Sequence, residues 1–226
     1  TMLALWRVVG FGVFLMLRPS PPRPEKKVTK PVSFTILLQD RRFVLYLVPW
    51  LMFNLIDILE KSVLEGYSNT FPGPEFSQIV ARAEPVIASF SILIGGLLAD
   101  RVGRKRVVIY GFVSLGVAYA IIGMAPTFLI AWYLYLVIDG LAAGILWIIF
   151  ILILWGDLSH NGCREKYYAI GNLPFFASSI FPLFILPMTE LVPPTAAFSL
   201  ASFFLFLAVL PLMYASETLP EKKIEL

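Results

Sequence analysis

The sequence predicts an all-α integral membrane protein, on three observations. Of its 226 residues, 58% are hydrophobic and 15% are charged, whereas a soluble domain has about 45–50% apolar and about 25% charged residues. The mean hydropathy is +0.81. The apolar residues also gather in stretches that approach the length of about 20 residues needed to cross a bilayer as a helix.

The composition excludes several classes of function. With 18 Lys+Arg against 15 Asp+Glu, the net charge of +3 is too small to indicate a nucleic-acid partner. One cysteine, Cys163, and one histidine, His160, exclude an internal disulfide and a metal site built from several such side chains. Neither a Walker loop, a dinucleotide fingerprint nor a Ser/His/Asp set is visible. We therefore expect no enzyme activity, no cofactor and no nucleic acid.

Seven apolar stretches are candidate membrane spans. A helix rises about 1.5 Å per residue, so each of them approaches the thickness of about 30 Å of a hydrocarbon core. We name the first the leading span and the others spans 1 to 6, in chain order. They are residues 2–17, 43–59, 79–99, 107–124, 128–155, 168–188 and 196–214.

The spans divide the chain into four parts. Residues 1–17 carry Arg7 within their apolar run and no small-residue cleavage site, so we interpret them as the end of a preceding transmembrane helix rather than a signal peptide. Residues 18–42 form a linker that is first rich in proline and basic residues and then suited to a short interfacial helix. Residues 43–214 form a unit of six transmembrane helices, and residues 215–226 form a tail.

The basic residues predict the orientation in the membrane. They gather in the linker, in the loop after span 2, in the loop after span 4 and in the tail, while the alternate loops contain only Lys61. Cytoplasmic loops carry the excess of Lys and Arg. We therefore expect these basic segments and the C-terminus to face the cytoplasm. We expect the protein to lie in the plasma membrane.

Spans 1 and 4 carry the polar residues that indicate function. Asn54 and Asp57 lie three residues apart on one face of span 1, and Asp139 lies within span 4. An ionised Asp at the middle of a membrane costs about 2.5–3.5 kcal/mol on insertion scales, so it faces a partner or a wet cavity. Two interpretations stay open for Asp139: a residue that lines a solute path, or a buried residue that is satisfied by a hydrogen bond or by a basic partner such as Arg82. An asparagine such as Asn54 more often serves helix packing than solute binding.

Other features favour helix packing. Span 4 also has Gly140 and Gly144, a spacing that usually marks a close contact between helices. Spans 2 and 5 are rich in small residues and proline, which suits packing or a moving interface. Spans 3 and 6 have no charged residue, so we expect them at the lipid-facing periphery.

A motif follows span 2 and reads GGLLADRVGRKR from Gly95 to Arg106. It combines a small-residue helix end, an acid, a turn at Gly103 and a cationic cluster. This resembles the GxxxD(R/K)xGR(R/K) signature of the major facilitator superfamily of secondary transporters, which lies between the second and third helices of a six-helix unit. Residues 216–220, Ser-Glu-Thr-Leu-Pro, are weakly similar to the Pro-Glu-Thr-type sequence that follows the sixth helix of a half in sugar-porter relatives. The positions that fill the signature are Gly96, Asp100, Arg101, Gly103, Arg104 and Lys105.

The resemblance implies an architecture and a mechanism. Such transporters have two six-helix halves, each built from two inverted three-helix repeats. Spans 1 to 6 would then be the C-terminal half, and the N-terminal half would be missing from this sequence. In that family the first and fourth helices of each half line the central cavity, and the signature latches the cytoplasmic side closed.

These observations predict transport of a small solute by alternating access, with proton coupling as one option. Asp139, Asp57 and Asn54 are the candidate cavity residues, and the expected partners are a small-molecule substrate, the lipid bilayer and the missing half. Acidic cavity residues favour cations, sugars or protons over an anion. The alternative, from another class, is a helical membrane scaffold or receptor that transports nothing.

Overall fold

The computed structural model of the chain describes residues 34–68, 71–159, 163–178, 180 and 193–219. Contacts divide the chain into the units Thr1–Pro31 and Val32–Leu226, and the described residues all belong to the second. The predicted leading span at residues 2–17 and most of the linker lie outside them. Five of the helices within the described ranges are long and apolar enough to cross a membrane. This confirms an all-α protein of the multi-pass membrane type.

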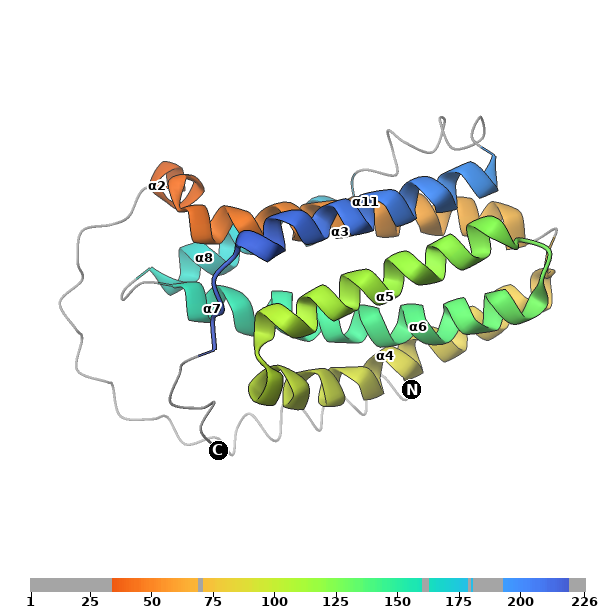
Figure 1. Cartoon of the computed structure of the whole chain (residues 1–226), viewed down its shortest axis with the longest axis horizontal. Coiled ribbons are helices and arrows are strands. Elements are labelled where there is room, and N and C mark those ends of the chain that lie inside the picture. Colours follow the sequence, from red (N-terminus) through yellow and green to blue (C-terminus); the bar gives the residue numbers. More distant parts are fainter. Residues whose placement is uncertain (1–33, 69–70, 160–162, 179, 181–192, 220–226) are drawn as a thin grey trace, which may run out of the picture. The chain divides into compact units, whose positions relative to one another are not determined.

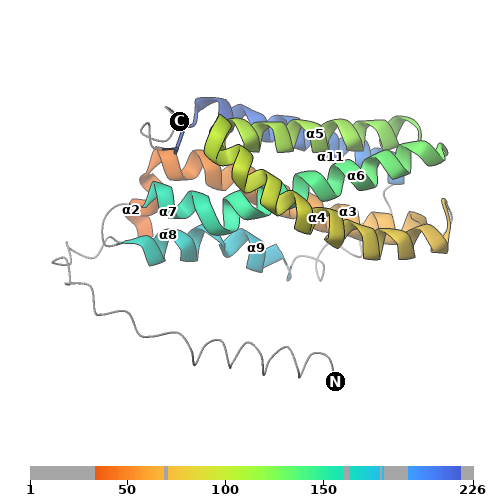
Figure 2. The same cartoon turned by 90° about the horizontal axis from the view of Figure 1, so that it is seen from below.

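Each of the long helices packs against one or more of the others. Helix α11 lies beside both α3 and α5, while α6 lies beside both α5 and α4 (Figure 1). Seen from below, the short helices α8 and α9 lie along one side of these long helices (Figure 2). The elements are α2 (Phe34–Gln39), α3 (Arg41–Ser68), α4 (Pro74–Val102), α5 (Arg104–Met124), α6 (Leu129–Trp147), the π-helix η1 (Ile148–Ile153), α7 (Leu154–Leu158), α8 (Arg164–Gly171), α9 (Leu173–Ser178) and α11 (Pro194–Tyr214).

The helices differ from the predicted spans in two places, although the candidate membrane spans Arg41–Lys61 and Leu129–Leu158 agree with spans 1 and 4. Span 1 was expected to end at Leu59, but α3 continues to Ser68, so Glu60 lies inside a helix instead of in a loop. Span 4 was expected to be one α-helix, but it passes through η1, where the backbone N–H of Leu154 donates to the carbonyl of Ile149. A π-turn inserts one extra residue into the helical repeat, and such turns are frequent at functional sites.

Span 5 was expected as one helix over residues 168–188. Its described part begins earlier, at Arg164, and is divided at Asn172 into α8 and α9. Pro174 explains the interruption, because proline has no N–H to donate to the carbonyl of residue 170 and its ring crowds that carbonyl. The rest of span 5 beyond Ile180 lies outside the described residues.

Span 3 was expected at the lipid-facing periphery, and one face of α5, with Tyr110, Val113 and Val117, is exposed. The other faces of this helix are packed. Helix α5 packs on α11, α6 and α4, and buries residues along its whole length, from Arg104 to Ile122. Its small residues explain this. A Cβ on Gly116 would come within 3.2 Å of the Phe206 ring on α11, and one on Gly111 within 3.1 Å of Leu146 on α6. Small residues let neighbouring helices approach closely without help from charge.

The contact predicted from Gly140 and Gly144 is confirmed, and its partner is α4. A Cβ on Gly140 would lie 2.9 Å from Ile87, and one on Gly144 would collide with Ser91 and with the carbonyl of Ala88. The hydroxyl of Ser91 in turn donates to the carbonyl of Gly140 at 3.1 Å. This contact fixes the position of α6 on α4, and with it the place of the neighbouring Asp139.

We predict that Gly144→Ala lowers the free energy of unfolding by about 1–3 kcal/mol, because the new methyl group forces α4 and α6 apart. Gly96→Ala is the matched control, since a Cβ there meets no atom within 4 Å. It should leave stability unchanged or raise it by up to about 1 kcal/mol, as Ala is the better helix former. Denaturant titration of both variants in micelles measures this. Equal effects of the two substitutions would contradict the close contact.

Candidate functional site

Carboxylates from three helices gather near the end of the bundle where α4 begins. Asp57 and Glu60 come from α3, Glu84 from α4 and Asp139 from α6, and the other three all act electrostatically on Asp139. We call these four residues the carboxylate cluster. One cation, the ammonium group of Lys61, acts on Asp139 as well. Sequence reasoning predicted Asp57 and Asp139 as site residues but did not include Glu60, Glu84 or Lys61.

Glu60 is the most deeply buried member of the cluster. It is 5% exposed, and its Oε1 accepts a hydrogen bond from the phenol of Tyr135 on α6. The Tyr135 ring is fixed in turn by edge contacts with Tyr119 and Trp132. A buried carboxylate without a donor is costly. The Tyr135 hydroxyl therefore stabilises Glu60 and joins α3 to α6.

Asp57 has its own partner. Its Oδ2 lies 2.9 Å from the Nζ of Lys61, one helical turn further along α3. The Lys61 side chain is 47% exposed, so this pair lies at the edge of the cluster. Beside it, a cavity of about 180 Å³ between α3 and α4 is lined by Lys61 and Glu84, with Ser77 and apolar side chains. Of the carboxylate cluster, Glu84 thus faces a small cavity whose lining is mainly apolar.

Asp139 and Asn54 have different surroundings. The Asp139 side chain is partly buried, and no hydrogen bond or ion pair within the described ranges includes it. Arg82, the partner considered from the sequence, is exposed on α4 and takes part in none of the described ion pairs. Asn54 is buried and donates to the carbonyl of Trp50 in its own helix at 2.7 Å. The Asn54 amide is thus satisfied within α3, which indicates a role in packing.

At the other end of the bundle, the motif forms the turn from α4 to α5. Gly103 separates the two helices with φ of +107°, a conformation that side chains rarely adopt. A Cβ at this position would also lie 2.6 Å from the carboxylate of Glu217. Glycine is therefore required at position 103 both by the backbone and by the space.

Glu217 caps the start of α5 from the segment that follows α11. Its carboxylate accepts the backbone N–H groups of Arg104 at 2.9 Å and Lys105 at 3.2 Å. It also accepts those of its own neighbours Thr218 and Leu219, at 2.9 and 3.1 Å. A carboxylate at a helix N-terminus satisfies unpaired N–H groups and the helix dipole. Glu217, which belongs to the stretch noted in the sequence, thus contacts the motif through its carboxylate.

Arg104 is the buried cation of the motif. Its side chain is 8% exposed and forms an ion pair with Asp157 of α7, and a longer one, at 3.6 Å, with Asp100. Lys105 donates its ammonium group to the carbonyl of Met213 at 2.8 Å. Within the described residues, Gly103, Arg104 and Lys105 therefore hold four segments together: the ends of α4, α5, α7 and α11.

Of the remaining motif positions, only Asp100 takes part in these contacts, through its pair with Arg104 at 3.6 Å. Gly96 has open space where a side chain would be, Arg101 is exposed, and the Asp100 side chain is 52% exposed. Structural roles thus account for half of the predicted motif residues. The other half face outward. Asp157 was the partner that sequence reasoning missed; its only signal was an acid at the end of an apolar span.

Comparison with known proteins gives no further assignment. No family model, curated protein or solved structure matches this chain. The resemblance in the motif remains a prediction from its residues.

We predict that Tyr135→Phe lowers the free energy of unfolding by about 1–3 kcal/mol, because it leaves Glu60 buried without its donor. The matched control is Tyr133→Phe, since Tyr133 is 43% exposed on the same helix. Chemical denaturation of the two variants in micelles makes the comparison. If Tyr135→Phe is as mild as the control, Glu60 does not depend on this phenol.

We predict that Arg104→Gln costs about 3–5 kcal/mol of stability, because it strands Asp157 and removes a buried cation. Arg101→Gln, the same change at the exposed neighbour, should stay within about 0.5 kcal/mol of the parent protein. Thermal unfolding followed by tryptophan fluorescence compares them. Similar losses from both substitutions would show that Arg104 is not the residue that holds the helix ends.

Proposed function

We propose that the chain is the C-terminal half of a secondary transporter of the major facilitator type, which moves a small solute by alternating access. The observation that carries the proposal is the carboxylate cluster. An acidic side chain within a membrane span marks a solute or proton path by default. Asp139 is such a side chain, and it lies among helices α3, α4 and α6 without an ion pair in the described part of the chain.

The helix neighbours support an inverted repeat. Suppose that α3, α4 and α5 form one repeat, and that α6, the α8–α9 segment and α11 form the other. Then α3 corresponds to α6, α4 to the α8–α9 segment and α5 to α11. The pair α3–α11 therefore corresponds to the pair α6–α5. Both pairs are neighbours in the structure. The pair α4–α6 likewise becomes the pair of α9 with α3, and these are also neighbours. The pair α5–α11 maps onto itself. These relations agree with two three-helix repeats, while the neighbouring pair α4–α5 has no counterpart of similar extent between the α8–α9 segment and α11.

One face of α4 supports the existence of a second half. It carries large apolar side chains that no described residue covers, among them Phe90, 65% exposed, and Leu97, 63% exposed. Asp100 and Arg101 lie at the end of the same helix, where Arg101 is exposed and the Asp100 side chain, paired with Arg104, is still 52% exposed. In the proposed transporter this face meets the N-terminal half, and Asp100 lies close to it on the cytoplasmic side.

The cluster suggests the chemistry of the solute path. Its four carboxylates outnumber the one nearby ammonium group, so the site favours a cation, a proton or a polyol over an anion. Asp139 is the residue we propose for proton coupling, with Asp57 beside it. The protein would lie in the plasma membrane with its C-terminus in the cytoplasm, as the distribution of basic residues indicates.

We predict that Asp139→Asn abolishes proton-driven accumulation of the solute while exchange continues, because an amide cannot carry the proton. The native protein that contains this sequence, reconstituted in liposomes with an imposed pH gradient, gives both readouts. The matched control is Glu75→Gln, an exposed carboxylate in the first turn of α4, which should keep both activities.

Accumulation that survives Asp139→Asn would contradict proton coupling at this residue. Loss of solute binding as well would assign Asp139 to recognition. A parent protein that shows neither uptake nor exchange for any candidate solute would favour the scaffold alternative.

A further inference from the structure

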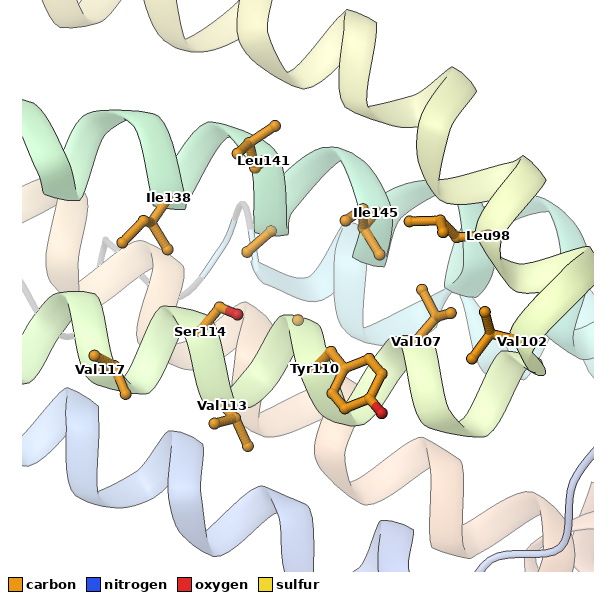
Figure 3. A pocket seen from close by; sticks show the side chains of 12 residues that line it. Leu98, Val102, Val107, Tyr110, Val113, Ser114, Val117, Ile138, Leu141 and Ile145 are labelled. Atoms are coloured by element: carbon orange, nitrogen blue, oxygen red, sulfur yellow. The ribbon is translucent and has the colours of Figure 1, made fainter.

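A second cavity lies along the outside of α4, α5 and α6. It is a groove of about 490 Å³, and its lining is almost entirely apolar. Side chains of α5 and α6 flank it from two sides, while Leu98 and Val102 of α4 close the end nearest the motif (Figure 3). We call it the α4–α5–α6 groove. Leu98 and Val102 belong to the motif, whereas no member of the carboxylate cluster lines the groove.

The dimensions of the groove match a hydrocarbon chain. Its lining on α5 runs from Val107 to Val117, which is about 15 Å along a helix axis. That length is about half of a hydrocarbon core of about 30 Å, the depth of one leaflet. The groove is open along its side and has a volume of about 490 Å³. A helix with side chains, about 10–12 Å across, can cover such a groove but cannot enter it.

Two arginines stand at the motif end of the groove. Arg106 precedes the lining residue Val107, and it shares a helix face with Tyr110 and Ser114, which also line the groove. Arg101 precedes Val102 on the opposite wall. Both arginines are exposed, and among the described ion pairs neither has a carboxylate partner. The apolar groove thus ends in a cationic site at the level where a span meets water.

We propose that the α4–α5–α6 groove binds an anionic phospholipid, with one acyl chain between α5 and α6 and the phosphate on Arg106, supported by Arg101. Guanidinium groups are well suited to phosphate, which they can bind through two parallel N–H donors. Each basic residue near an anionic lipid surface is worth about fivefold in affinity. The length of the groove and its apolar walls fit an acyl chain. The positive charge at its end favours an anionic lipid over a neutral one.

The test measures lipid retention by the purified, delipidated protein. Native mass spectrometry with added phosphatidylglycerol or phosphatidylcholine gives the dissociation constant for each lipid. The parent protein should bind phosphatidylglycerol more tightly. Arg106→Gln should weaken that binding about fivefold and leave phosphatidylcholine unchanged. Arg41→Gln is the matched control, an exposed arginine at the start of α3, and should change neither.

A second variant tests the groove itself. Ser114 is exposed and lines the groove, so Ser114→Phe fills it without entering the core. It should weaken the binding of both lipids, whereas Ser89→Phe, at an exposed serine of α4 outside the groove, should not. Equal affinity for the two lipids in the parent protein would overturn the proposal. Lipid retention that is unchanged by Arg106→Gln or by Ser114→Phe would also overturn it. So would the finding that a second copy of the chain, and not lipid, occupies the groove.

Discussion

Inside a bilayer there is no water to satisfy a polar group, so each buried donor, acceptor and charge must find its partner within the protein. The packing of this chain follows from that constraint. Ser91 donates to the carbonyl of Gly140 across the α4–α6 contact, and Ser202 donates to that of Gly116 across the α5–α11 contact. Glycines at these contacts let the backbones approach. Where a charge is buried, as at Glu60 and Arg104, a partner comes from another helix.

The same helices carry both ends of the candidate mechanism. Helix α4 has Glu84 in the carboxylate cluster and Asp100 in the motif. The path from α6 through η1 to α7 likewise runs from Asp139 to Asp157, the partner of Arg104. A tilt of either element would move both ends at once. In the proposed transporter, occupancy of the cluster and opening of the motif end are coupled through these two rigid elements.

The sequence predicted those features that depend on local composition. Hydropathy placed α4, α5 and α11 within a few residues of their ends, and the order of residues around Gly103 predicted the turn. The failures involve tertiary contacts. Glu60 looked like a loop residue because the phenol that stabilises it lies on another helix. Asp157 gave no signal, because an acid after an apolar span is common. Nothing in the apolar stretch 148–153 distinguishes the π-helix from an α-helix.

The most direct test of alternating access uses two cysteines on the exposed face of α4. Val86 and Leu97 are 55% and 63% exposed, share that face and lie about 16 Å apart along the axis. The native Cys163 is buried and gives a low background. Each position is replaced by cysteine and labelled from either side of the membrane, with and without Asp100→Asn. Loss of the latch predicts faster labelling at position 97 from the cytoplasm and slower labelling at position 86 from the opposite side. Unchanged rates, or changes in the same direction, would contradict the account.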